Sequence, residues 1–274
     1  MKKNDNTNQI IKDYLNGISN KELSEKYGLH RVSIQRLLKR NNVSLRLKET
    51  NRKHKIDFNL FKEIDTEFKA YFFGLVYADG NLFRNCIDIT LIDKQILEDI
   101  SLMVYGKIVL GERKAKTVNF KQKKYNQKKQ YRFLITCKEI VNDLKKYGLH
   151  ENKGYTIRLP NIKKELIRHF IRGYMDGDGC VFLDFKYNKN HRATLVSNKK
   201  FCNDIKKIVE DKINITSYIK PKKGKMFDFI IYGKNQVLLF LDWIYNDSTI
   251  RLERKYKKYL ELKTYEKTNS VNRI

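Results

Sequence analysis

The chain has 274 residues, with 58 Lys and Arg against 31 Asp and Glu, which gives a formal net charge of +27. Hydrophobic residues make up 41% of the chain, and this share is enough to build hydrophobic cores and excludes disorder of the whole chain. The excess of positive charge favours a polyanionic partner, either nucleic acid or an anionic membrane.

The pattern of apolar residues and of potential metal-binding side chains reduces the number of possible partners and metal sites. The longest apolar run, residues 71–78, is far shorter than the ~20 residues that a membrane-spanning helix needs. The polar N-terminus has no apolar signal core, so we expect an intracellular protein with no membrane partner. The four cysteines form no CxxC pair and the five histidines form no metal motif, so any bound metal should be held by carboxylates.

Residues 1–44 predict a small unit of three helices. The first helix is expected over residues 8–16, Asn20 should cap a second helix, and a third, basic helix should run from about Arg31 to Asn41. The order of short helix, glycine turn and basic helix is typical of a helix-turn-helix. The residues expected to face its core are Ile11, Leu15, Leu23, Tyr27, Val32, Ile34 and either Leu37 or Leu38.

The third helix leaves a polar and basic face for water or for DNA. If this unit binds DNA, the contacts are expected from Arg31, Ser33, Gln35, Arg36 and Lys39. The alternative is a three-helix module with a solvated basic face. Residues 45–56 are polar and basic, and they are interpreted as a linker.

The rest of the chain contains an internal duplication. Similar segments recur about 100 residues apart, and they divide it into a first repeat at 57–162, a second repeat at 163–265 and a tail at 266–274. Each repeat predicts a helix, two strands, a helix, two strands and a helix, so the fold class is α+β. The expected strands are 82–83, 87–92, 107–112 and 131–136 in the first repeat, and 180–185, 193–197, 216–221 and 227–232 in the second. Two such copies predict a monomer that acts as a pseudo-dimer.

The first helix of each repeat ends in an Asp-Gly pair that follows two small residues. Gly74 and Ala78 are four positions apart, as are Gly173 and Gly177, so each pair lies on one face of its helix. Such a face lets another backbone approach closely, and we expect the two helices to pack against each other.

This packing would bring Asp79 and Asp178 together at two helix C-termini. Two like charges at the negative ends of helix dipoles are unfavourable, and a hard cation such as Mg²⁺ would remove both objections. The alternative is that each aspartate simply precedes a C-capping glycine. Asp176 has no acidic counterpart in the first repeat, so a surface or capping role is expected for it.

The segments Gly74–Gly80 and Gly173–Gly179 resemble the two motifs of single-chain, double-motif LAGLIDADG homing endonucleases. The resemblance covers roughly residues 57–265. It implies two αββαββα repeats whose antiparallel sheets form a saddle over double-stranded DNA. It also implies Mg²⁺-dependent cleavage of both strands across the minor groove, with 3′ overhangs and with Mn²⁺ as a substitute metal.

The same resemblance implies roles for individual residues. Asp79 and Asp178 correspond to the metal-binding acids, and the glycines that follow them, Gly80 and Gly179, are assigned to the same metal site. The family also places a basic residue near each scissile phosphate, late in each repeat. Lys153 and Lys255 occupy such positions, although either lysine could equally be an ordinary phosphate or solvent contact.

Two basic segments are further candidates for DNA contacts. Between Arg113 and Lys129 there are eight Lys or Arg residues and no acid, interleaved with Gln, Asn and aromatic residues. The segment could be a solvated hairpin tip, a loop that DNA orders, or both. The contacts expected from it and from the turn near residue 222 are Arg113, Lys114, Lys116, Lys123, Lys124, Lys128, Lys222 and Lys223.

Three functions are compatible with these features. The first is a site-specific DNA endonuclease with an accessory helix-turn-helix, and the second is a DNA-binding regulator that has lost the chemistry. The third is an RNA-binding splicing helper, because a basic surface alone does not separate DNA from RNA. The aspartate pair favours the endonuclease. An intein is not expected, because the chain begins with neither Cys nor Ser and does not end in His-Asn.

Overall fold

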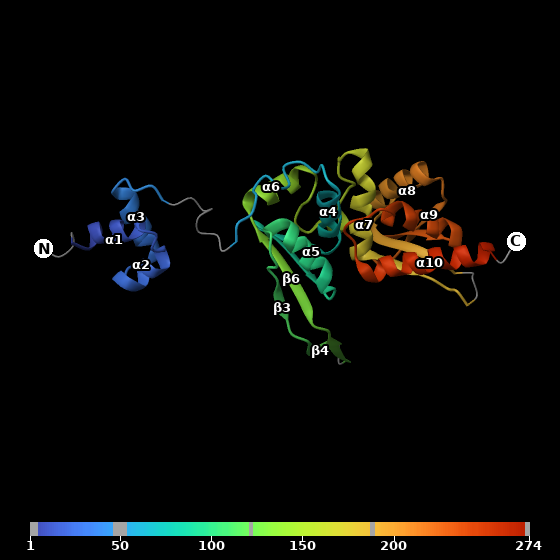
Figure 1. Cartoon of the computed structure of the whole chain (residues 1–274), viewed down its shortest axis with the longest axis horizontal. Coiled ribbons are helices and arrows are strands. Elements are labelled where there is room, and N and C mark those ends of the chain that lie inside the picture. The colour runs from blue at the N-terminus through green and yellow to red at the C-terminus, as the bar shows by residue number, and fades with distance from the viewer. Residues whose placement is uncertain (1–4, 46–53, 121–122, 187–189, 272–274) are drawn as a thin grey trace. The chain divides into compact units, whose positions relative to one another are not determined.

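The computed structural model describes residues 5–45, 54–120, 123–186 and 190–271. The chain divides into two compact units, Met1–Ile56 and Asp57–Ile274 (Figure 1). Each unit has its own hydrophobic core, and the two are described separately.

The first unit contains three helices, α1 (Asp5–Leu15), α2 (Asn20–Tyr27) and α3 (Arg31–Arg40). The cap of α2 is Ser19 rather than the expected Asn20. Its hydroxyl accepts a hydrogen bond from the backbone N–H of Glu22, whose carboxylate accepts one from the backbone N–H of Ser19. This reciprocal arrangement satisfies two N–H groups that a helix end otherwise leaves unpaired. Gly28 ends the helix in the left-handed conformation, with φ of 65°.

The core of the first unit differs in part from the expected one. Its fully enclosed residues are Ile10, Tyr14, Leu23, Ile34 and Leu38. Leu15 is 69% exposed and Val32 is 44% exposed, so the sequence interpretation placed both incorrectly. On α1, Ile10 and Tyr14 have the same four-residue spacing as Ile11 and Leu15. Helical periodicity alone therefore does not determine which pair faces the core. The packing of three short helices selects the first pair and leaves the second at the rim.

The second unit contains the two repeats. The first consists of α4 (Glu67–Asp79), β1 (Gly80–Phe83), β2 (Cys86–Leu91), α5 (Lys94–Tyr105), β3 (Gly111–Arg113), β4 (Lys116–Phe120), β5 (Lys123–Gln127), β6 (Gln130–Thr136) and α6 (Lys138–Lys146). The second consists of η1 (Lys153–Tyr155), η2 (Lys164–Leu166), α7 (Ile167–Asp178), β7 (Gly179–Phe182), β8 (Arg192–Asn198), α8 (Lys199–Ile213), β9 (Ser217–Pro221), β10 (Met226–Tyr232), α9 (Lys234–Tyr245) and α10 (Glu253–Val271). Apart from the β4–β5 hairpin, the two 3₁₀ turns and α10, each repeat has the order αββαββα, which confirms the expected α+β fold.

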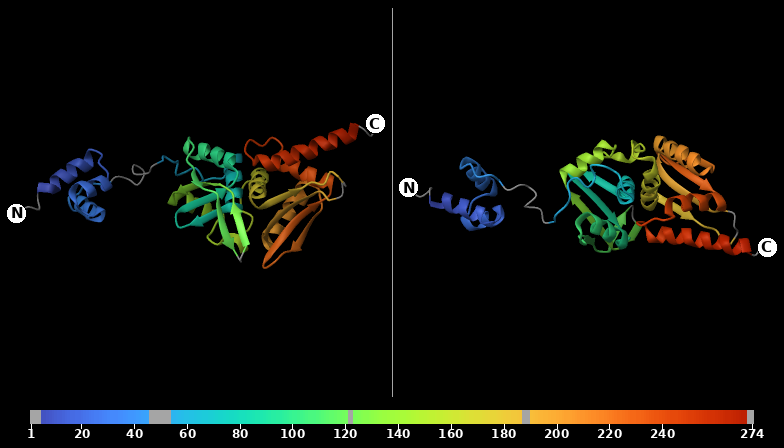
Figure 2. Two further views of the ribbon diagram at one scale, coloured as in Figure 1. Left: turned by 90° about the horizontal axis from the view of Figure 1, so that it is seen from below. Right: turned by 45° about the horizontal axis from the view of Figure 1, so that its top comes forward.

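Each repeat forms one antiparallel sheet of four strands, in the equivalent orders β1-β2-β6-β3 and β7-β8-β10-β9. In the first sheet Ile87 pairs with Ile135 and Ile89 pairs with Phe133, and all four side chains are buried. The alternate residues of the same strands lie on the opposite face, where helices do not cover them. The two sheets therefore each have one buried face and one open face, and α4 and α7 lie between the repeats (Figure 2).

The expected strand at 107–112 is largely absent, and only its end belongs to β3. Ser101, which is fully buried, explains the difference. Its hydroxyl donates to the carbonyl oxygen of Lys107 at 2.9 Å and accepts from the N–H of Val109 at 2.7 Å, so this backbone bonds to a side chain instead of to a strand. The residues after β3 form the β4–β5 hairpin, which lies beyond the end of β6 (Figure 1). The expected C-terminal tail is helical as far as Val271.

Candidate active site and nucleic-acid interface

Helices α4 and α7 pack directly against each other, backbone against backbone. A side-chain carbon at Gly74 would overlap the carbonyl oxygen of Phe170, and one at Gly173 would overlap the carbonyl oxygen of Tyr71. The two contacts are related by the pseudo-symmetry of the repeats. Glycine is therefore required at both positions by close approach, and this outweighs the ~1 kcal/mol that glycine costs inside a helix.

The second pair of small residues lies at the end of the interface, next to the acids. A side-chain carbon at Gly177 would overlap Cβ of Ala78 and would lie 2.9 Å from Oδ2 of Asp79. Asp79 and Asp178 are the last residues of α4 and α7. The packing therefore places the Asp79 carboxylate against the final turn of α7, one residue before Asp178.

The environment of these two carboxylates opposes their ionisation. Burial raises the pKa of Asp79, and nearby lysines partly offset this effect. Burial raises the pKa of Asp178 to about 6, and the neighbouring charge of Asp79 adds to this shift. Among the described residues, no donor forms a hydrogen bond or an ion pair with either carboxylate. The helix ends thus hold two acids without a protein counter-charge in contact.

Lys153 and Lys255 enter the same site, each bound to backbone carbonyls. Lys153, in η1, donates to the carbonyl oxygen of Gly80. Lys255, in the first turn of α10, is only 3% exposed and donates to the carbonyl oxygens of Met175 and Asp176 at 2.6 and 2.7 Å. Burial lowers the pKa of Lys153, and it lowers the pKa of Lys255 to about 8. The structure therefore brings together all four residues that the sequence analysis selected for catalysis.

The glycines that follow the acids have a packing role. A side-chain carbon at Gly80 would lie 2.6 Å from the carbonyl oxygen of Val76, and one at Gly179 would overlap Met175. Each strand therefore begins in close contact with the last turn of the helix before it. The carbonyl of Gly80 already accepts the Lys153 ammonium.

The donor set of the site can be compared with the needs of a divalent cation. Magnesium prefers oxygen ligands and commonly uses one or two carboxylates together with water and phosphate oxygens. Asp79 and Asp178 fit that pattern, and a cation between them would offset their repulsion. The described part of the chain contains no group of three or more His, Cys, Asp and Glu side chains that could hold a metal ion. The remaining ligands would therefore be water, backbone oxygen and phosphate.

Asp176 does not have the surface role that was expected for it. Its side chain is 2% exposed and accepts hydrogen bonds from the hydroxyls of Tyr71 at 2.8 Å and Tyr245 at 2.5 Å. It also accepts one from the backbone N–H of Leu252 at 2.8 Å, just before α10 begins. The first repeat has Tyr77 at this position, so comparing the repeats could not reveal a hydrogen-bonding partner.

Sequence analysis also missed an ion pair that joins the repeats near the acids. Nε of Arg254 lies 3.2 and 3.0 Å from the two carboxylate oxygens of Asp93. Asp93 precedes α5 of the first repeat, whereas Arg254 belongs to α10. The charge of Arg254 lowers the pKa of Asp79, while Asp93 acts in the opposite direction. The only signal in the sequence is that Arg254 adjoins Lys255.

The residues selected for DNA contacts lie on exposed surfaces. On α3, the side chains of Arg31, Ser33, Gln35, Arg36 and Lys39 are all exposed. Around the hairpin and the turn after β9, the exposed side chains are Arg113, Lys114, Lys116, Lys124, Lys128, Lys222 and Lys223. The side chain of Lys123 lies outside the described part of the chain.

The open face of the first sheet carries a polar pair that the sequence analysis did not select. Arg132 on β6 donates two hydrogen bonds to Asp88 on β2, at 2.9 and 2.7 Å. On the second sheet, Lys222 lies 3.2 Å from Asp228. Arg132 and Asp88 each lie next to buried apolar residues in their strands. The alternation of apolar and polar residues along these strands could therefore have revealed that both lie on the open face.

The two αββαββα repeats pack together through two helices that each end in an aspartate. This arrangement defines the class of fold. Residues 165–245, which span α7 to α9, match the family model of a LAGLIDADG-like domain. This match confirms, for the second repeat, the resemblance seen in the sequence. A search of curated proteins found no match.

Solved structures that are similar to this chain include homing endonucleases and DUF199/WhiA. Full-length DUF199/WhiA from Thermatoga maritima is 14% identical over 78% of this chain and 69% of its own, with a TM-score of 0.45. The homing endonuclease I-WcaI, bound to its DNA recognition sequence, is 19% identical over 67% of this chain and 81% of its own, with a TM-score of 0.45. I-SmaMI, bound to an uncleaved DNA target with calcium ions, is 10% identical over 75% of this chain and 93% of its own, with a TM-score of 0.47.

The structure also bears on the membrane alternative. Across residues 5–45, 54–120, 123–186 and 190–271, no helix has the length and apolar character needed to cross a bilayer.

Proposed function

We propose that the protein is a site-specific endonuclease of the homing type that hydrolyses both strands of double-stranded DNA. The observation that supports this most directly is the placement of Asp79 against the end of α7, next to Asp178. Both side chains reach solvent at the helix ends, and a pair of adjacent acids with raised pKa values costs stability unless a ligand uses them. The +27 charge supports a polyanionic substrate.

In this proposal each side chain of the site has its own role in phosphodiester hydrolysis. Asp79 and Asp178 would hold Mg²⁺, or Mn²⁺ in its place, and the metal would polarise the phosphate and lower the pKa of bound water. Lys153 and Lys255 would stabilise negative charge that develops on the phosphate or orient the attacking water. The carbonyls that they bind adjoin the two acids, namely Gly80 for Lys153 and Gly177 for Lys255, so each ammonium would exchange a carbonyl contact for one to phosphate or water.

The open faces of the two sheets are proposed to carry the DNA. Strands lying along the major groove would present alternate side chains to base edges, while the acids face the minor groove between the repeats. Cutting across the minor groove would leave 3′ overhangs. The exposed lysines of the β4–β5 hairpin would bind phosphates, and α3 would lengthen the recognised site as part of a helix-turn-helix. One chain would be sufficient, because its repeats supply both halves of the site.

A second candidate is a DNA-binding protein without nuclease activity. The feature that favours it is the binding of Lys255 to backbone carbonyls at the end of α7, which is also what a purely structural helix cap would do. This candidate leaves the two adjacent acids without a role, and for that reason we prefer the endonuclease.

Selection for cleaved sequences from a random DNA pool with Mg²⁺ tests the proposal and yields a target. On a supercoiled plasmid carrying that target, Asp79→Asn and Asp178→Asn should each abolish double-strand cleavage while leaving DNA affinity within a few-fold of wild type. Asp211→Asn, at an exposed acid on α8, is the matched control and should cleave normally. Double-strand cleavage that survives in both site variants would overturn the assignment, and tight binding without any wild-type cleavage would favour the second candidate.

A further inference from the structure

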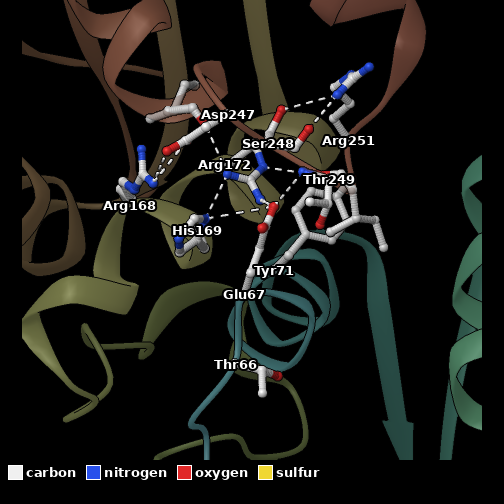
Figure 3. Close-up of polar contacts among 12 residues, drawn as sticks. Thr66, Glu67, Tyr71, Arg168, His169, Arg172, Asp247, Ser248, Thr249 and Arg251 are labelled. Atoms are coloured by element: carbon white, nitrogen blue, oxygen red, sulfur yellow. Dashed lines mark hydrogen bonds and ion pairs between the residues drawn. The ribbon is translucent and has the colours of Figure 1, made fainter.

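One face of α7 is charged and is directed toward the connection between α9 and α10. Arg168, Arg172 and Asp176 are spaced four residues apart, so they form one stripe along the helix. All three bind residues 243–252, and Figure 3 shows the contacts of Arg168 and Arg172. Gly173 and Gly177, which follow Arg172 and Asp176 directly, contact α4, and Arg172 and Asp176 also bind Glu67 and Tyr71 of α4. The helix therefore joins the repeat interface to the chain segment that leads to Lys255.

Arg172 is the centre of this network (Figure 3). Its side chain is fully buried and donates to the carbonyl oxygens of Ile244 at 2.8 Å and Ile250 at 3.0 Å. It also donates to the carboxylate of Glu67 at 2.5 Å. Glu67 lies at the start of α4 and accepts a further bond from the backbone N–H of Thr249 at 2.8 Å. One ion pair thus connects both repeats and both ends of the α9–α10 connection.

The remaining members of the stripe hold the two ends of the same segment. Arg168 lies 2.9 Å from Asp247, and Asp176 accepts the backbone N–H of Leu252 at 2.8 Å. Helix α10 begins at Glu253, directly after Leu252. Lys255 is therefore placed at the end of α7 by a chain segment that is anchored along its whole length.

Only one of these charges has an equivalent in the first repeat, because Lys69 occupies the position of Arg168 and binds Asp65 instead. When Asp79 is aligned with Asp178, Phe73 takes the place of Arg172 and Tyr77 takes the place of Asp176. The segment that leads to Lys153 is held at Tyr147 by aromatic contacts and by neutral hydrogen bonds. Its carbonyl accepts from the Tyr77 hydroxyl at 3.2 Å, and its own hydroxyl donates to the carbonyl of Lys62 at 3.3 Å and accepts from the N–H of Ile64 at 3.4 Å. The chain segments that carry Lys153 and Lys255 are therefore held in place by different kinds of contact.

We infer that Arg172 and Glu67 are positioning residues that place Lys255 in the active site, and that they thereby control the cleavage of one DNA strand. The inference rests on the proposed function. In the described part of the chain the stripe binds the segment that leads to Lys255 and not the segment that leads to Lys153, so disturbing it should separate the two cuts. A purely structural network would instead affect both cuts to a similar degree.

Arg172→Lys is the main test, since lysine keeps the charge but cannot bind two carbonyls and a carboxylate in one plane. With end-labelled duplex and Mg²⁺, the cut of one strand should slow by about 10- to 100-fold, as expected for a misplaced catalytic group. The other cut should stay within about threefold of wild type, and supercoiled plasmid should accumulate as the nicked circle. Glu67→Gln should act on the same strand, and Lys255→Met should identify that strand.

The control is Arg158→Lys, which makes the same substitution at an exposed ion pair with Asp204, outside residues 243–252. It should leave both cuts unchanged. All cleavage is measured at a temperature where circular dichroism shows each variant folded. Equal slowing of both strands in Arg172→Lys, or a deficit on the strand that Lys255→Met leaves intact, would overturn the inference. Absence of cleavage by the wild type would instead contradict the proposed function.

Discussion

Gly173 lies so close to Tyr71 that a single added carbon would overlap the tyrosine carbonyl oxygen. The same relationship joins Gly74 to Phe170 across the pseudo-symmetry axis. These close approaches set the separation of the helices, and the separation sets the distance between the acids at their ends.

We predict that Gly173→Ala lowers the free energy of unfolding by at least the 1–3 kcal/mol that is typical of overpacking, because the added methyl meets rigid backbone. Thermal and denaturant unfolding would measure the change. Gly154→Ala provides the comparison, since no atom lies within 4 Å of the new carbon and its φ is not positive. Equal stability of the two variants would contradict the close packing of α4 and α7.

The second prediction concerns the raised pKa of Asp178 in metal-free buffer with EDTA. Its carboxyl has a pKa near 3.8 when unfolded and about 6 when folded, so the folded state binds a proton more tightly. The resulting stability is present below pH 3.8 and is lost as the pH rises through 6; because the Asp178 side chain is exposed, solvent screening keeps this loss well below the ~3 kcal/mol that the full shift would give. Asp178→Asn should remove this loss, and unfolding curves between pH 4 and 7 would show whether the wild type alone declines.

The third prediction concerns Asp13, which accepts hydrogen bonds from Lys26 at 2.7 Å and from the Tyr27 hydroxyl at 2.6 Å. These bonds lower the pKa of Asp13, with the Lys26 bond as the largest cause. The stability that they provide is present above the unfolded pKa near 3.8 and is lost as the pH falls through the folded value. Hydrogen exchange in α1 and α2, expressed as protection factors that remove the pH dependence of intrinsic exchange, should become faster on acidification in the wild type. In Asp13→Asn it should be fast already at neutral pH.

The fourth prediction tests the basic hairpin as a phosphate-binding surface. Changing Lys114, Lys116, Lys124 and Lys128 together to Gln should weaken DNA binding. It should also reduce the slope of log affinity against log salt by about 0.9 for each phosphate that the variant no longer neutralises. Lys138 and Lys145, which are exposed on α6, are changed to Gln as a comparison pair away from the hairpin. If the hairpin variant kept the wild-type salt slope, the hairpin would not bind phosphate.

Much of the fold could be predicted because it depends on local patterns that occur twice. The glycine pairs, the Asp-Gly pairs and the alternating strands predicted the order αββαββα before any tertiary structure was known. Errors arose where periodicity allowed two answers, as for Ile10 and Ile11 on α1, or where a buried hydroxyl replaced strand pairing, as for Ser101. The helix-turn-helix assignment and the catalytic roles stay predictions.

The sequence by itself determined the duplication, the two acids and the small residues that let their helices meet, because each of these is a short-range feature repeated at a fixed spacing. Only the tertiary structure decided what Arg172, Asp176 and Lys255 bind. Their partners lie about 70 to 105 positions away and are largely backbone carbonyls and N–H groups, which nearly every residue carries. No pattern of side chains in the sequence identifies such a partner. The network can therefore be recognised only in the folded structure, where residues 243–252 lie against α7.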